Sequence, residues 1–340
     1  MPTSTWNRVL AEVTRLQTQD EQNPPHPGQA SNQDRYRRGK ITAIERVTHR
    51  PLMVYASACT SPAKPVAAEM LMLDFTDKIG FKTVTDSIAP PALDILIHSP
   101  GGYAEAAESI VQQVRAKYSD VRFIVPSFAK SAATMFVMSG NEILMDPDAE
   151  LGPIDPQMRT PSGASPAESI LEQFAKAQAE LQADATRLPS WVPILSPLGP
   201  SLLVDSRNAI DLSKALVKTW TKTYMLAGDP AAEEKSARIS EYLGSYANFK
   251  SHARAVKIPQ LLPLGVKVTD VRTNAALYAA VDELYCCLDI LFANSPTYKI
   301  FENSAGDALV RQSAGMIAPP IVQLLQRQPS PLPPRLPRRR

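Results

Sequence analysis

The residues in this sequence whose types and spacing could do chemistry are a glycine pair, Gly101-Gly102, and a serine, Ser131, that follows 29 residues after the pair. Glycine lets a backbone amide approach a ligand closely, and the start of a helix leaves amides unpaired with a partial positive charge. The amides of Gly101 and Ala132 could therefore converge on one oxygen as it becomes an oxyanion, with the Ser131 hydroxyl between them. One such donor typically stabilises a transition state by about 3 kcal/mol. The pattern predicts an acyl-transfer site.

Two strand–turn–helix units are expected to position these residues. The apolar run 93–97 predicts a buried strand, the glycine pair ends it, and 104–117 predicts a helix. Residues 121–125 predict a second strand, after which a helix of small residues opens at Ser131. In such a βαβα unit the two strands are parallel neighbours, so both the glycine pair and Ser131 fall at the carboxyl edge of the sheet. That edge is where α/β sheets place their sites.

Each of these features also has a purely structural interpretation. Gly-Gly after a strand is a common turn, and serine is a preferred helix N-cap. What favours a chemical site is their combination at βαβ spacing.

Three motifs extend the pattern: Ile-His-Ser-Pro-Gly-Gly (97–102), Val-Pro-Ser-Phe-Ala-Lys-Ser-Ala-Ala-Thr-Met (125–135) and Leu-Gly-Pro-Ile-Asp-Pro-Gln (151–157). Together they resemble the ClpP (caseinolytic-protease)/crotonase superfamily, and within it the serine dehydrogenase proteinases, relatives of signal peptide peptidase A. A weaker likeness extends over 41–306. The resemblance implies a ClpP/crotonase-type α/β fold of stacked βαβ units with a helical C-terminal portion. The family name does not imply a dehydrogenase, because the chain has no dinucleotide-binding fingerprint.

The resemblance also implies an activity and roles for residues. The activity is that of a serine peptidase, a hydrolase that cleaves peptides or unfolded protein through an acyl-enzyme. Ser131 matches the nucleophile, and Gly101 and Ala132, with Gly102 beside them, match the oxyanion hole. Relatives form closed oligomers, so we expect a homo-oligomer.

The general base stays open, although a serine hydroxyl is a poor nucleophile until some group accepts its proton. Asp155 follows Ser131 by 24 residues, where the resemblance to chambered proteases would place a histidine. Carboxylates of ordinary acidity are weak bases toward serine at neutral pH, so orienting another group or capping a turn is the favoured role. Relatives of signal peptide peptidase A use a lysine further along the chain, but none occurs between Lys176 and Lys214.

Lys130 and two histidines are the other candidates near the site. Lys130 matches the family's Ala-Lys-Ser, but neighbours at such a turn usually point apart, and pairing with a carboxylate or another subunit is the alternative. His252 lies in a segment that resembles a histidine-containing segment of relatives, and an imidazole can accept a proton near neutral pH. A surface or capping role is its alternative. His98 is expected to pack beneath the site, because strand neighbours alternate faces.

Composition limits the remaining possibilities. The formal net charge is +2, and five arginines lie in the last 14 residues, so the rest of the chain carries −3 and has no nucleic-acid footprint. Three cysteines make no disulfide framework, which favours a reducing compartment, and we expect a cytoplasmic protein. No apolar run is long enough to span a membrane. Because Cys and His never cluster at zinc spacing and no phosphate-binding loop occurs, we expect no metal and no other cofactor.

We expect four parts along the chain. They are an amphipathic N-terminal helix (1–20), a linker rich in Pro, Gln and Asn (21–40), a peptidase domain (41–312), and a C-terminal segment (313–340) that ends in a disordered Pro/Arg-rich tail. The further strands predicted are 41–47, 52–56 and 142–145, with a short one within 264–268. The further helices predicted are 66–79, 167–186, 203–227, 231–243 and 274–292.

Two rival functions use the same sequence features. A catalytically inactive member would keep the oxyanion turn and serve as an oligomeric scaffold or peptide-binding protein, and would not react with a serine-directed probe. Alternatively, the oxyanion hole could hold the thioester of an acyl-CoA, and the protein would then bind a CoA resin. The serine at the helix start favours the peptidase over CoA chemistry.

Overall fold

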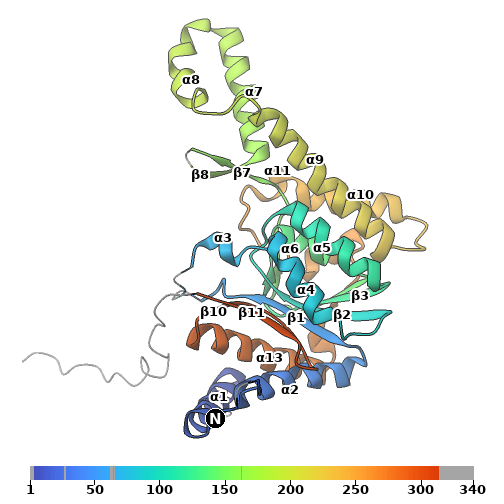
Figure 1. Ribbon diagram of the computed structural model, residues 1–340. Coiled ribbons are helices and arrows are strands. Elements are labelled where there is room, and N and C mark those ends of the chain that lie inside the picture. The colour runs from blue at the N-terminus through green and yellow to red at the C-terminus, as the bar shows by residue number, and fades with distance from the viewer. Residues whose placement is uncertain (1–3, 27, 62–63, 65, 162, 314–340) are drawn as a thin grey trace, which may run out of the picture.

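The computed structural model describes residues 4–26, 28–61, 64, 66–161 and 163–313, and its centre is a seven-stranded sheet (Figure 1). The strand order is β11-β10-β1-β2-β3-β5-β9, in which β1, β2, β3, β5 and β9 are parallel while β10 and β11 form an antiparallel edge. The bounds are β1 Leu52–Ser57, β2 Ala92–His98, β3 Asp120–Val125, β5 Glu142–Met145, β9 Val268–Asp270, β10 Thr297–Asn303 and β11 Ala308–Gln312. The predicted α/β fold class is confirmed.

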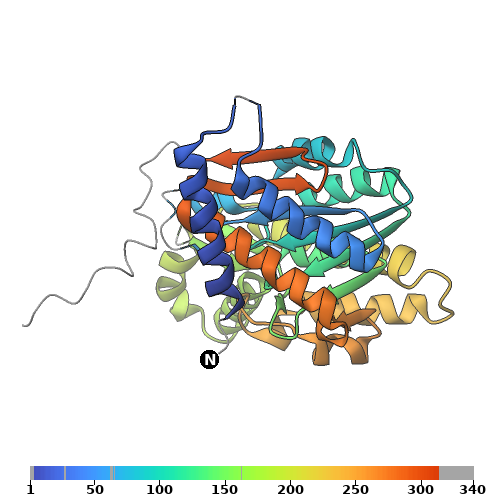
Figure 2. The ribbon, with the colours of Figure 1, turned by 90° about the horizontal axis from the view of Figure 1, so that it is seen from below.

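Helices cover both faces of the sheet, because alternate residues of each strand enter different cores. Tyr55 and Ile97 belong to the core under α4 (Lys78–Thr85), α5 (Ala104–Lys117) and α6 (Ala132–Val137). Val54 and Leu96 belong to the core under α2 (Asn32–Thr48) and α13 (Ala275–Asn294). Figure 2 shows α2 and α13 side by side on one face of the sheet, with α1 (Thr5–Gln22) outside them. An N-terminal helix is predicted over 1–20; in the structure the helix is Thr5–Gln22, and it packs on α13.

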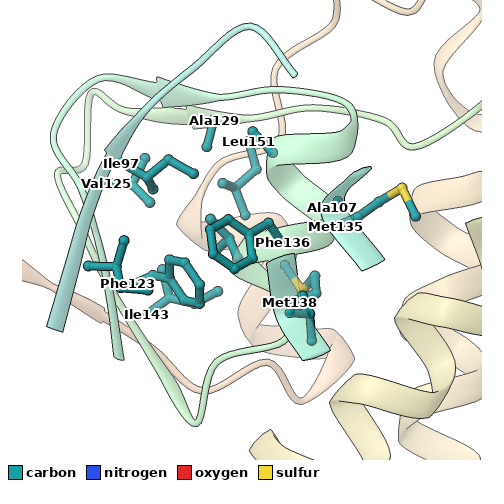
Figure 3. Close-up of a cluster of buried hydrophobic side chains, with 14 of the residues drawn as sticks. Ile97, Ala107, Phe123, Val125, Ala129, Met135, Phe136, Met138, Ile143 and Leu151 are labelled. Carbon is teal, nitrogen blue, oxygen red and sulfur yellow. The ribbon is translucent and has the colours of Figure 1, made fainter. Parts of the chain in front are cut away.

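The helix that follows Ser131 is fixed by aromatic packing. All six residues of α6 are buried, and Phe136 contacts the rings of Phe81 and Phe123 with centroids 5.4 and 4.8 Å apart. Figure 3 shows Phe136 among side chains of the sheet and of α5. Edge-to-face pairs of this kind add to the free energy gained by burying the rings. The start of α6 is therefore held rigidly at the carboxyl ends of β2 and β3.

A helical extension stands at one end of the sheet (Figure 1). It follows the hairpin of β7 (Gln157–Thr160) and β8 (Gly163–Pro166) and precedes β9. Its helices are α7 (Ala167–Ala183), α8 (Leu188–Leu195), α9 (Leu202–Trp220) and α10 (Ala232–Gly244). Helices α7, α9 and α10 correspond to the predicted helices 167–186, 203–227 and 231–243, whereas α8 was not predicted. The described part of the chain contains no helix that is both long and apolar enough to cross a membrane.

Two predicted elements are wrong. The predicted strand 41–47 lies inside α2. This helix begins after Ser31, whose hydroxyl accepts a hydrogen bond from the Asp34 amide, and it buries Ile41 and Ile44 at helical spacing. The predicted helix 66–79 is replaced by the single-turn α3 (Ala68–Leu71) and a 3₁₀ turn, Phe75–Asp77, because Leu73 between them is extended.

Because α2 starts at Asn32, the predicted linker 21–40 is helical in its second half. The division into four parts otherwise stays a prediction. The predicted disordered tail lies outside the described residues.

Candidate active site

Ser131 occupies the turn between β4 (Phe128–Ala129) and α6 with a backbone conformation of φ 51° and ψ −124°. A positive φ is rare for a residue other than glycine and costs about 1–3 kcal/mol, so it persists only where the surroundings enforce it. Ser131 is the N-cap of α6, yet its side chain caps no amide. The hydroxyl makes no hydrogen bond to another described residue, so the capping interpretation does not account for the serine.

The glycine pair lies directly against this turn. Gly101 has φ 95°, and a methyl group added to it would come within 2.4 Å of the Lys130 carbonyl oxygen and 2.7 Å of Ser131 Cβ. Ser99 and Ala129 are bridged in parallel next to this contact, with Lys130 N donating to Ser99 O at 3.1 Å. Only glycine fits such an approach. The two loops that the sequence places at one sheet edge are therefore in contact.

The amides of the glycine pair differ in their partners. Gly101 N donates to Ser99 Oγ at 3.2 Å. For Gly102 N and Ala132 N, no acceptor occurs among the residues that the structure describes. Leu73 holds this segment in place: Leu73 N donates to Gly101 O at 2.7 Å, and Tyr103 N donates to Leu73 O at 3.0 Å. Beside the Ser131 turn the amides of Gly102 and Ala132 are thus free, whereas the Gly101 amide, which the sequence predicts to be an oxyanion donor, is taken up by Ser99.

Lys130 is held in an ion pair. Its Nζ lies 2.6 Å from Glu150 Oε2 and donates to the Leu151 carbonyl at 3.3 Å, which ties the Ser131 turn to β6 (Glu150–Leu151). The stem passes so close to Gly152 that an added methyl group there would lie 2.9 Å from Lys130 Cδ. This geometry favours the carboxylate-pairing alternative for Lys130.

Asp155 and His252, which the sequence offers as separate candidates, form a pair. His252 Nδ1 lies 2.8 Å from Asp155 Oδ1, and Gln157 Nε2 donates to Asp155 Oδ2 at 2.8 Å. Asp155 is buried, whereas about a quarter of the His252 side chain is exposed. Leu151 and Val256 exchange two backbone hydrogen bonds and so bring the two segments together. A carboxylate that holds Nδ1 fixes the ring and leaves Nε2 to act on another group.

One hydrogen bond joins this segment to the helix that starts at Ser131. Gly152 N donates to Thr134 Oγ1 at 2.9 Å, and Thr134 Oγ1 donates to Ala129 O at 2.7 Å. The strand that leads to Asp155 therefore runs beside the first turn of α6. No hydrogen bond joins Ser131 Oγ to His252 in this structure. Catalytic hydrogen bonds are often long or unformed before substrate binds.

His98 lies beneath the site, as predicted. It is buried between the rings of Phe128 and Tyr285, at centroid distances of 4.5 and 5.3 Å, and its Nε2 lies 3.5 Å from Cys59 Sγ. Burial lowers the pKa of His98 to about 4. The imidazole is therefore neutral near pH 7 and has a packing role. Among the described residues, no group of three or more His, Cys, Asp and Glu could hold a metal ion.

Comparison with known families agrees with this geometry. Residues 78–193 match the family described as ClpP-like SDH-type serine proteinase. The matched segment contains all three motifs, hence the glycine pair, Ser131 and Asp155, but not His252. The match confirms the resemblance to the serine dehydrogenase proteinases that the motifs predict. It supports a serine peptidase class for the protein.

Two curated relatives come from Methanocaldococcus jannaschii, and both are named as uncharacterized proteins. MJ1495 is 29% identical over 177 residues, which are 52% of this chain and 51% of that protein. MJ0137 is 28% identical over 200 residues, which are 58% of each chain. The chain thus spans a little over half the length of these relatives.

Two solved structures are similar at low sequence identity, and both are mutants of the 1510-N membrane-bound stomatin-specific protease. The first is 16% identical with a TM-score of 0.35 and covers 67% of this chain and 82% of that one. The second, in complex with a substrate peptide, is 16% identical with a TM-score of 0.36 and covers 67% and 78%. The fold assignment rests on the sheet topology and the family match.

Proposed function

We propose that this protein is a serine endopeptidase that cleaves peptides or unfolded protein through an acyl-enzyme at Ser131. The observation that carries the proposal is the Ser131 turn: a strained backbone, a hydroxyl unused by the helix, and direct contact with the glycine pair. A rigid scaffold that holds a serine in a costly conformation, with free amides beside it, suits attack on a carbonyl.

In the proposed mechanism His252 is the general base, and Asp155 holds its Nδ1–H. As Ser131 Oγ bonds to the substrate carbonyl carbon, its proton passes to His252 Nε2. The carbonyl oxygen becomes an oxyanion and accepts hydrogen bonds from the amides of Gly102 and Ala132. When the C–N bond breaks, His252 returns the proton to the leaving amine. Water then attacks the carbonyl carbon of the acyl-enzyme while His252 takes its proton, and His252 passes that proton to Ser131 Oγ as the ester bond breaks and the acid product leaves.

Substitution of Ser131 tests the nucleophile. Ser131→Ala should lower the hydrolysis of unfolded casein by more than about 10³-fold, because no acyl-enzyme can form. The matched control is Ser127→Ala, which removes a hydroxyl from the same loop and should retain activity. Equal activity of wild type and Ser131→Ala would refute the proposal.

Substitution of His252 tests the base. His252→Gln should lower kcat by about 10²–10⁴-fold, the usual contribution of a positioned base, while His26→Gln, which alters an exposed histidine outside the fold core, should not. If His252→Gln keeps full activity while Ser131→Ala loses it, the base lies elsewhere.

One observation favours a second candidate, the inactive scaffold. The Ser131 hydroxyl has no hydrogen bond to His252. The structure therefore contains a histidine oriented by Asp155 and a serine that it does not contact through a hydrogen bond. A scaffold would show neither hydrolysis nor reaction with a fluorophosphonate in wild type.

A further inference from the structure

A fully buried ion pair lies behind the glycine pair, and a tyrosine hydroxyl is hydrogen-bonded to its carboxylate. Lys299 of β10 places its Nζ 2.9 and 3.0 Å from the two carboxylate oxygens of Asp77, and the Tyr55 hydroxyl of β1 donates to Asp77 Oδ2 at 2.9 Å. The relative exposures of Lys299, Asp77 and Tyr55 are 1%, 0% and 0%. Burying two charges costs several kcal/mol each before their attraction offsets it, and apolar residues would often be as stable. The pair therefore needs a reason other than stability.

The pair holds the backbone on both sides of Leu73. Lys299 Nζ donates to the carbonyl of Met72 at 2.7 Å, and the amide of Asp74 donates to Asp77 Oδ2 at 3.2 Å. Leu73 is in turn the residue that pairs with the glycine segment, through its bonds to Gly101 O and Tyr103 N. The buried cation is thus separated from the glycine pair by one residue.

The fit between Leu73 and Gly102 leaves no slack. A methyl group added at Gly102 would lie 2.1 Å from the Leu73 carbonyl oxygen and 2.6 Å from its nitrogen. A displacement of Leu73 therefore moves the glycine pair, since Leu73 is bridged to Gly102 and hydrogen-bonded on both sides of it.

Tyr55 also reaches toward the other side of the same loop. Burial raises the pKa of the Tyr55 phenol well above its usual value, and Asp77 raises it further, while the Ser99 side chain acts in the opposite direction. Ser99 Oγ is the acceptor for Gly101 N. The Tyr55 hydroxyl thus lies near both Asp77 and Ser99, the two groups that hold the segment of the glycine pair in place.

We propose that Lys299, together with Asp77 and Tyr55, is a positioning group that fixes the glycine pair against the Ser131 turn and so sets the direction of the Gly102 amide. The inference rests on the proposed function, because it assigns that amide to the oxyanion. Displacement of a catalytic group by about 1 Å can cost on the order of 10²-fold in rate.

The test replaces the ion pair by neutral groups and compares it with a matched ion pair on the same strand. Lys299→Met with Asp77→Asn removes the charges without leaving one of them alone. Arg37→Met with Glu302→Gln neutralises a pair that is also buried and includes the adjacent part of β10, but that holds α2 rather than Leu73. It also takes a partner from Arg38 and from Asp34, whose side chains are partly exposed and can be solvated. Both double variants are compared in thermal unfolding, kcat, KM, and hydrogen–deuterium exchange of segment 99–104.

We expect the Lys299/Asp77 variant to lose about 10²-fold in kcat with little change in KM, and to exchange faster over 99–104. The Arg37/Glu302 variant should keep kcat within about twofold and leave that segment protected, whatever its melting temperature. If the Lys299/Asp77 variant does not fold, Tyr55→Phe, which removes only the hydroxyl, should show the same changes at smaller size.

Unchanged exchange over 99–104 in the variants of this network, or equal loss of kcat in the Arg37/Glu302 variant, would overturn the inference. The exchange measurement needs no catalysis. Faster exchange in a protein whose wild type hydrolyses nothing would therefore support the positioning role while refuting the proposed function.

Discussion

At the residue scale, the proposed chemistry depends on a contact between a strained serine and a glycine that tolerates no side chain. Gly101 and Ser131 both have positive φ, and the two residues touch. The strain at Ser131 is maintained by packing of α6 and by the Lys130 ion pair. A substitution at Gly101 should therefore displace Ser131.

We predict that Gly101→Ala destabilises the fold by more than about 3 kcal/mol and abolishes hydrolysis, because the added methyl group meets the Lys130 carbonyl in addition to the cost of φ 95°. Gly228→Ala is the control, since Gly228 has φ 79° but nothing within 4 Å of an added methyl group, and it should cost only about 1 kcal/mol. Urea unfolding measures both. Equal losses of unfolding free energy in the two variants would mean that the positive φ alone, without the steric contact, explains the requirement for glycine at position 101.

His98 gives a prediction of pH dependence. Burial lowers its pKa to about 4, from an unfolded value of 6.5, so in this interval the unfolded chain binds a proton that the folded one does not. Stability should thus fall as the pH drops from about 6.5 toward 4, by up to about 3 kcal/mol from this residue. Its neighbours do not titrate there, because burial raises the pKa of Cys59 to about 11 and also raises that of Tyr285.

The His98→Gln variant should therefore lose less stability than wild type between about pH 7 and pH 4.5 in urea unfolding. Parallel loss of stability in the two proteins would show that His98 is not the group that titrates.

The sequence allowed the local part of the site to be predicted but not the distant part. Ser131 and the glycine pair follow from turn chemistry at the ends of two neighbouring strands. The bond between Asp155 and His252 joins residues 97 positions apart, and Lys299 lies 222 positions from Asp77. No local pattern predicts such pairs. Lys299 gave no signal either, because its strand, β10, was not predicted from the sequence.

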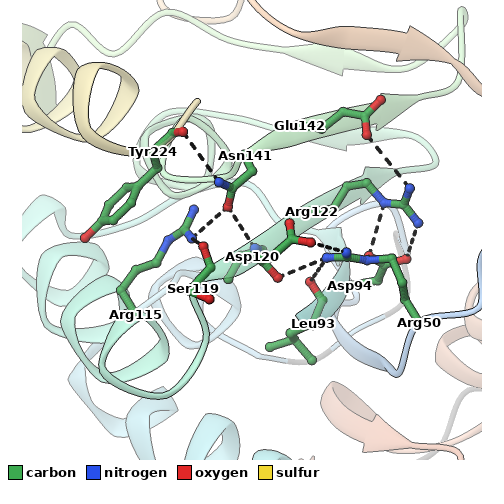
Figure 4. Close-up of polar contacts among 11 residues, drawn as sticks. Arg50, Leu93, Asp94, Arg115, Ser119, Asp120, Arg122, Asn141, Glu142 and Tyr224 are labelled. Carbon is green, nitrogen blue, oxygen red and sulfur yellow. Dashed lines mark hydrogen bonds and ion pairs between the residues drawn. The ribbon is translucent and has the colours of Figure 1, made fainter. Parts of the chain in front are cut away.

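At the element scale, the two edges of the parallel sheet have different roles. Ion pairs connect the amino ends of β2 and β3: Asp94 accepts hydrogen bonds from Arg50 at 2.6 Å and from Arg122 at 2.7 Å (Figure 4). The carboxyl ends lead to the glycine pair and to Ser131. This separation indicates that stability and chemistry can be changed independently.

Asp94→Asn should accordingly cost about 3 kcal/mol of unfolding free energy, because two guanidinium groups lose a buried carboxylate, and should leave kcat within about twofold. Glu283→Gln is the control, since its pairs with Arg8 and Lys40 are more exposed and should contribute less than about 1 kcal/mol. Thermal unfolding and peptide hydrolysis check both variants. A loss of kcat in folded Asp94→Asn would contradict the separation of the two edges.

Elements were predictable where one pattern dominates. Residues 104–117 and 142–145 form the predicted helix and strand with the predicted bounds. The prediction failed for α2 and for 66–79, where tertiary contacts decide: α2 is fixed by packing on β1 and Leu73 by pairing with the glycine segment. The hairpin of β10 and β11 was missed because its place at the side of the sheet depends on pairing of β10 with the distant strand β1.

At the scale of the whole molecule, large apolar side chains are exposed in more than one place among the described residues, for example at Phe75 and Ile79 and on the helical extension. Exposed apolar side chains gather on α8 and the start of α9, namely Leu188, Val192, Ile194 and Val204. Apolar patches on a protein surface often mark contacts between chains. The homo-oligomer that the family resemblance implies stays a prediction, and this patch is where we expect such a contact.

The proposed function requires that Ser131 acts as a nucleophile. The most direct measurement is reaction of the intact protein with a fluorophosphonate, followed by mass spectrometry of its peptides. We predict one adduct, on Ser131, that forms in wild type and in Ser127→Ala and does not form in Ser131→Ala. No adduct in folded wild type, or an adduct on another residue that persists in Ser131→Ala, would contradict it.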